Sequence, residues 1–132
     1  MTVAKHETSV RVRYAETDRM GIVYHGNYFQ YFEIGRTEAM RSLGATYRAL
    51  EERGFALAVV ECAANFRAAA KYDDELRIVT IPAPAGRVRL RFDYEIWRGE
   101  KLLCEGFTVL ACLREGKPVE LPPEIRAMIG TA

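Results

Sequence analysis

The sequence predicts an α+β fold in which a five-stranded antiparallel sheet packs one face against a single long helix. Three observations favour this class. A segment near the start alternates apolar and charged residues as a strand does, and apolar residues then recur at helical spacing. After Gly54 the chain reads as four strands joined mostly by tight turns, which makes neighbouring strands antiparallel. The length of 132 residues suits one domain, so we expect residues 1–132 to form it.

The first strand is predicted over residues 9–14, with the sequence SVRVRY. Val10, Val12 and Tyr14 would share its buried face, and two arginines would face solvent. A polar loop follows it.

The long helix is predicted over residues 27–43, with Asn27 as N-cap, Gln30 three residues later and Gly44 at its C-terminal end. A shorter helix over residues 46–53 ends at Gly54. The residues of the long helix that would form its apolar stripe are Tyr28, Phe32, Gly35, Ala39 and Leu43.

Four strands are predicted after Gly54, over residues 55–70, 75–81, 88–97 and 102–114, and a helical turn from Pro122 and Pro123 to Met128 closes the chain. The third of these strands alternates most clearly. Its buried face would carry Val88, Leu90, Phe92, Tyr94 and Ile96. Because the edge strands and the second face of the sheet still need cover, we expect an oligomer.

Composition excludes several classes of function. The net charge of +1 gives no overall field for nucleic acid, and no apolar run approaches the ~18 residues of a membrane span. The first residues lack the apolar core of a secretory signal, so a cytoplasmic location is expected. Cys62, Cys104 and Cys112 are interpreted as small buried hydrophobic residues, the last two on one side of a strand.

The loop before the long helix places Asp18 seven residues before His25, with Gly21 between them. A carboxylate can attack a thioester carbonyl or activate water, and the unpaired N–H groups of a helix start can stabilise the oxyanion. Each residue also has a structural interpretation: Asp18 as a turn residue and His25 as a hydrogen-bonded structural histidine. Glu16 competes with Asp18 for the role of the acid.

The order of elements, together with the loop YAETDRMGIVYHGNY, resembles the hotdog-fold acyl-CoA thioesterases. Within them the chain is similar to the 4-hydroxybenzoyl-CoA thioesterase type and to the Tol–Pal-associated acyl-CoA thioesterases. The pattern continues with Phe32, Glu33 and Arg36, the last two of which are expected to form an ion pair. A second, weaker part is AKYDDEL, residues 70–76.

The resemblance implies that Asp18 is the catalytic carboxylate, acting as nucleophile or general base. It also implies that the backbone N–H of His25 faces the thioester carbonyl, and that Tyr14 and the His25 side chain line the site. Two positions depart from the family. Ala69 stands where relatives often carry proline, and Gly26 where many have alanine or proline.

The expected reaction is hydrolysis of a short-chain aliphatic or aromatic acyl-CoA to free acid and coenzyme A, without a cofactor. Tyr24 and Tyr28 are candidates for the pocket. Candidates for binding the phosphates of coenzyme A are Arg67, Lys71, Arg89 and Arg91. No metal site is predicted, since the two histidines show no ligand spacing. The resemblance implies a homotetramer, built as a dimer of dimers with active sites at the dimer interface.

Three alternatives stay open. The protein could bind acyl-CoA without hydrolysing it, or it could be a hotdog dehydratase that uses a histidine and a carboxylate across an interface. The third alternative is a sheet that binds nucleic acid through Arg87, Arg89 and Arg91, against which the near-neutral charge argues.

Overall fold

The structure is a computed structural model and describes residues 5–130. Within these residues no helix has both the length and the apolar character needed to cross a membrane. The elements in chain order are β1 (His6–Arg11), a 3-10 turn (Tyr14–Glu16), α1 (Asn27–Ser42), α2 (Tyr47–Glu52), β2 (Phe55–Phe66), β3 (Glu75–Pro84), β4 (Arg89–Arg98), β5 (Lys101–Arg114), β6 (Lys117–Pro118) and α3 (Pro123–Met128).

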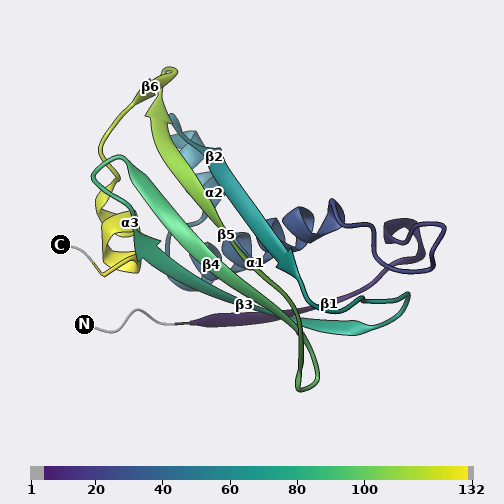
Figure 1. The fold of residues 1–132 in the computed structure, drawn as a ribbon. Coiled ribbons are helices and arrows are strands. Elements are labelled where there is room, and N and C mark those ends of the chain that lie inside the picture. Colours follow the sequence, from purple (N-terminus) through teal and green to yellow (C-terminus); the bar gives the residue numbers. More distant parts are fainter. Residues whose placement is uncertain (1–4, 131–132) are drawn as a thin grey trace.

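The strands form one antiparallel sheet in the order β1-β3-β4-β5-β2, and the two-residue β6 pairs with β5. The sheet curls around α1, and the loop that precedes α1 projects at the end opposite α3 (Figure 1). The predicted α+β class, with five strands around one long helix, is confirmed. The short β6 is an addition that the sequence did not predict.

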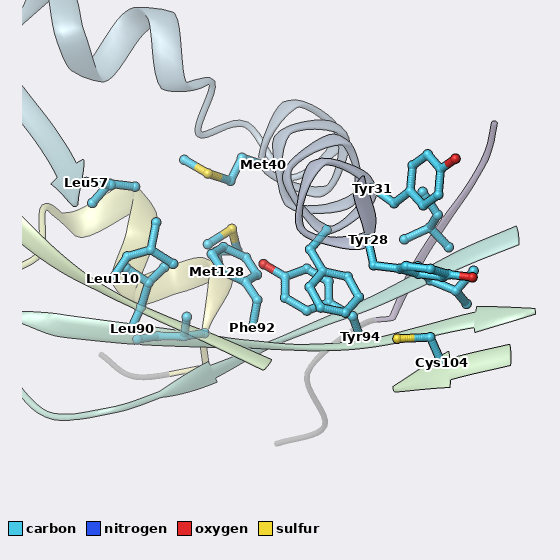
Figure 2. Packing of buried hydrophobic residues seen from close by; sticks show 14 of the residues in the cluster. Tyr28, Tyr31, Met40, Leu57, Leu90, Phe92, Tyr94, Cys104, Leu110 and Met128 are labelled. Carbon is cyan, nitrogen blue, oxygen red and sulfur yellow. The ribbon is translucent and has the colours of Figure 1, made fainter. Parts of the chain in front are cut away.

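The core lies between α1 and the concave face of the sheet. Figure 2 shows Tyr28, Tyr31 and Met40 of α1 in one buried cluster with Phe92 and Tyr94 of β4. The ring of Phe32, fully buried, stacks on Tyr94 with 4.3 Å between centroids. The alternation predicted for β4 is therefore confirmed from Leu90 to Ile96, and Phe92 and Tyr94 are among the largest fully buried side chains of the described residues.

Close contact between α1 and the sheet depends on Gly106 of β5. A Cβ at this position would lie 2.3 Å from the carbonyl oxygen of Ala63 on β2 and 2.9 Å from the ring of Phe32. Both distances are shorter than real contacts allow, so a side chain here would push the helix and the neighbouring strand away.

Several predicted boundaries were wrong. β1 ends at Arg11, and Tyr14 lies in the 3-10 turn with 78% of its surface exposed rather than on a buried strand face. β2 ends at Phe66 rather than at residue 70, because the next two amides both donate to the carbonyl of Leu103 and so leave the ladder. The N-cap of α1 is Gly26, in helical conformation, and not Asn27.

The cysteine predictions hold for two of the three residues. Cys104 and Cys112 are buried in the core, and burial raises the pKa of the Cys104 thiol to about 12. Cys62 is exposed on the edge strand β2, where it pairs with Thr108 and borders a surface pocket with residues of α1.

Candidate active site

A pocket of about 430 Å³ opens beside the start of α1. It lies between the loop that leads into the helix and the chain that leaves β2, two segments about 40 residues apart in the sequence. The lining residues are Asp18, Met20, Ile22, Val23, His25, Tyr28, Phe66, Arg67, Ala68 and Ala69. The structure thus brings together four of the predicted site residues, namely Asp18, His25, Tyr28 and Arg67.

The loop that carries Asp18 folds back on itself as a small hairpin. Thr17 pairs with Val23, and the amide of Asp18 donates to the carbonyl of Ile22 at 2.9 Å. Gly21 closes the turn with a φ of +80°, a conformation that favours glycine. The hairpin presents the half-buried Asp18 to the pocket, where one carboxylate oxygen accepts a 2.8 Å bond from the amide of Met20.

Glu16, the competing carboxylate, is occupied by structural bonds. It is 9% exposed and accepts from the amide of Arg13 at 2.9 Å, from Arg13 Nε at 3.0 Å and from the hydroxyl of Tyr31 at 2.9 Å. Burial alone would raise the pKa of Glu16, but these hydrogen bonds outweigh it and hold the pKa below its ordinary value. Glu16 therefore ties the loop to α1 and does not line the pocket.

The start of α1 leaves backbone donors beside the pocket. The amides of Asn27 and Tyr28 donate to the carbonyls of Tyr24 and His25. Among the residues that the structure describes, the amides of His25 and Gly26 have no acceptor. Asn27, predicted as the N-cap, instead donates from its side chain to the carbonyl of Glu16 at 2.8 Å. Free amides at a helix start form a suitable oxyanion site.

Aromatic rings surround the His25 side chain. Its ring lies 4.3 Å from Tyr24 and 6.4 Å from Phe66, and Phe66 packs edge-on against the buried Tyr28 at 5.2 Å. Tyr24 lies next to the site without lining the pocket. The sequence did not single out Phe66, because this residue lies within a long apolar run. Its place beside the pocket follows from the end of β2 at Phe66, earlier than predicted.

The predicted phosphate-binding cations lie at different places relative to the pocket. Arg67 lines the pocket and forms an ion pair with Glu105, which raises its pKa. Lys71 pairs by its backbone with Ile22, which places it at the rim and not in the lining. Arg91 lies elsewhere on the sheet, paired with Asp93.

Two further predicted arrangements are not found within residues 5–130. Tyr14 does not line the pocket of this chain, since its exposed ring packs edge-on against Tyr72 at 5.6 Å. Glu33 and Arg36 form no ion pair with each other in the described part of the chain, and Arg36 lies near the Tyr94 hydroxyl instead. In residues 5–130 no group of three or more histidine, cysteine or acidic residues could hold a metal ion.

Comparisons with known proteins agree with this geometry. The family model described as Thioesterase superfamily matches residues 20–105. The acyl-CoA thioesterase YbgC of Haemophilus influenzae is 36% identical over 121 residues, which are 89% of this chain and 89% of that protein. A putative esterase of Aquifex aeolicus is 30% identical over 115 residues, 87% of this chain and 90% of that protein.

Solved structures give the same picture. Slr0204, a 1,4-dihydroxy-2-naphthoyl-CoA thioesterase from Synechocystis, superimposes with a TM-score of 0.90 at 26% identity over 96% of both chains. A 4-hydroxybenzoyl CoA thioesterase superimposes with a TM-score of 0.84 at 20% identity over 95% of this chain and 98% of its own, a likeness of fold alone.

Proposed function

The chain belongs to the thioesterase superfamily and has the hotdog fold, and on this premise we propose that it hydrolyses an acyl-CoA to a free acid and coenzyme A. One observation carries the proposal. Asp18 and His25 line the same pocket and the His25 amide has no acceptor in the described residues, whereas the nearby Glu16 is committed to structural hydrogen bonds. A carboxylate and free backbone donors beside one pocket suit attack on a carbonyl.

In the proposed reaction the carbonyl oxygen of the thioester accepts a hydrogen bond from the His25 amide, which stabilises the negative charge that develops there. Asp18 either attacks the carbonyl carbon, giving a mixed anhydride that water then cleaves, or removes a proton from the attacking water. In both cases coenzyme A leaves as the thiol. A preorganised amide donor of this kind contributes about 100- to 1,000-fold to the rate.

The proposed acyl group is a short aliphatic chain or an aromatic ring. The rings of Tyr28 and Phe66 and the small side chains of Ala68 and Ala69 form an apolar wall beside Asp18. Such a wall favours apolar acyl groups without selecting a particular one. Arg67 and Lys71 at the mouth are the proposed contacts for the phosphates of coenzyme A.

We also propose that the protein is a homo-oligomer, assembled as a tetramer of two dimers. β2 is a 12-residue edge strand whose exposed residues include Val59, Val60 and Phe66, each 46–50% exposed. A long apolar edge strand is a site for pairing with a second chain. Because Phe66 also lines the pocket, a partner on this edge would lie next to the site. The expected cytoplasmic location stays a prediction.

The test is release of coenzyme A from a panel of aliphatic and aromatic acyl-CoAs by the wild type, Asp18→Asn and the control Asp93→Asn. Asp93 is a carboxylate of the same type, paired with Arg91 on the sheet and not in the lining of this pocket. We expect Asp18→Asn to lower kcat at least ~100-fold and the control to change it less than about two-fold.

Turnover that survives in Asp18→Asn would refute the role of Asp18. If neither the wild type nor the variants release thiol while acyl-CoA still binds, the protein is a binder without thioesterase activity, and the proposed reaction is wrong.

A further inference from the structure

The segment between β2 and β3, residues 67–74, forms one wall of the pocket. Arg67, Ala68 and Ala69 line the cavity, and except for the single bridge at Lys71 the segment belongs to no helix or strand. It contains most of the AKYDDEL motif, of which the proposed function uses only Lys71. A wall without a backbone ladder of its own has to be held in place by other contacts.

Arg98, the last residue of β4, provides such contacts. Its Nη1 donates to the carbonyl oxygen of Ala69 at 2.9 Å and to Asp74 Oδ2 at 2.9 Å. The same Asp74 oxygen accepts from the amide of Lys71 at 2.9 Å. One arginine and one aspartate thus join the middle of the segment to its end, although neither residue lines the pocket.

The Arg98–Asp74 pair is more enclosed than the other ion pairs of residues 5–130. The two side chains are 35% and 25% exposed, and every other pair among the described residues has at least one partner above 35%. A partly enclosed pair is screened less by solvent than a surface pair. Removing one partner also leaves the other without compensation, so the loss of either residue should loosen the segment.

The segment held by this pair touches the other two walls. The amide of Val23, in the hairpin loop that carries Asp18, donates to the carbonyl of Ala70 at 2.9 Å. On the helix side, the backbone of Ala70 lies next to the Tyr28 side chain, whose burial raises its pKa. A shift at residues 69–71 would therefore move the Asp18 loop and the start of α1 together.

We propose that Arg98 and Asp74 form a clamp that positions the pocket walls for hydrolysis, without touching the substrate. The inference rests on the proposed function, since it treats this pocket as the site of the reaction. Arg98 and Asp74 are positioning residues. Loosening the clamp misaligns Asp18 relative to the His25 amide, and a misplacement of about 1 Å can cost roughly 100-fold in rate.

The experiment compares Arg98→Met, Arg98→Lys and Asp74→Asn with the control Arg77→Met. Arg77 forms a half-exposed ion pair with Glu7 at 3.0 Å between β3 and β1, and it does not line the pocket. Steady-state kinetics separate kcat from KM. Hydrogen exchange measured by mass spectrometry on residues 17–26 and 67–74 follows the two walls without relying on turnover.

We expect Arg98→Met and Asp74→Asn each to lower kcat by about 10-fold or more, with KM changed less than about three-fold. Arg98→Lys, which keeps the charge and hydrogen-bond donors, should recover part of the loss. Exchange should rise in both walls. The control should change kcat less than about two-fold and leave exchange in these segments unchanged.

The clamp is refuted if Arg98→Met keeps the kcat of the wild type, or if Arg77→Met loses as much activity. If Arg98→Met and Asp74→Asn lose equal stability while kcat stays unchanged, the pair serves stability alone. That result also refutes the clamp. If the wild type itself hydrolyses no acyl-CoA, the proposed function fails. Exchange then decides the clamp, and unchanged exchange in both walls would overturn it.

Discussion

Replacing Glu16 by glutamine should destabilise the protein at neutral pH much more than a typical surface substitution does. The carboxylate is 9% exposed and accepts three hydrogen bonds, two from Arg13 and one from the Tyr31 hydroxyl. A glutamine amide has the same shape but no charge. Its NH₂ group can only donate, so it would face a hydrogen-bond donor at a position where the carboxylate offers an accepting oxygen. Hydrogen bonds to a charged group contribute about 1.5–3 kcal/mol each.

We therefore expect the free energy of unfolding to fall by about 2–3 kcal/mol at pH 7 in Glu16→Gln, since part of the hydrogen bonding survives. The difference should depend on pH. The pKa of Glu16 in the folded protein lies below its ordinary value of 4.5, so near that pH the unfolded state binds more protons. The stabilisation is fully present above about pH 5.5 and is lost as the pH falls through the folded pKa.

The assay is urea unfolding followed by circular dichroism at pH 7, 5.5 and 4, with linear extrapolation and one fixed protein concentration. Glu38→Gln is the matched control, because Glu38 pairs with Arg41 on the surface of α1 at 3.3 Å and is 40% exposed. We expect this control to cost less than about 0.5 kcal/mol. A Glu16→Gln difference that is no larger than the control, or that stays constant from pH 7 to pH 4, would refute the reasoning.

Two further predictions concern the core. Gly106→Ala should lower the free energy of unfolding by about 1–3 kcal/mol, because its Cβ would collide with the Ala63 carbonyl and the ring of Phe32. Thermal unfolding measures this loss, and an unchanged melting temperature would contradict the close packing. In the native protein at pH 8 a thiol reagent should modify at most Cys62, because the Cys104 thiol is buried with a pKa of about 12. Modification of Cys104 before unfolding would contradict its burial.

Local patterns predicted the secondary structure where one physical signal was clear. The alternation on β4 and the helical spacing on α1 each follow from which side chains face the core, and both elements formed as predicted. The errors lie at the ends of elements. Tyr14 continues the alternation of β1 in sequence, yet the chain turns after Arg11, since Glu16 caps a 3-10 turn through Arg13.

The site shows the same division. The loop sequence pointed to Asp18 and the helix start, but only the family resemblance, and not the local chemistry of the loop, preferred Asp18 to Glu16. The distinction depends on Tyr31, a residue 15 positions later, whose hydroxyl engages Glu16 and leaves Asp18 at the pocket. Phe66 escaped notice for a similar reason, because its place in the pocket depends on where β2 ends against Leu103.

The sequence by itself determined the α+β class, the order of its elements and the loop that holds the candidate chemistry, because periodicity and turn residues act over a few neighbouring positions. Only the tertiary structure decided which carboxylate faces the pocket, which aromatic rings surround His25 and which arginine holds the opposite wall. Those choices depend on hydrogen bonds and ring contacts between residues 15 to 41 positions apart. No local pattern shows such contacts, because the type of one residue does not reveal which distant residue it will touch in the fold.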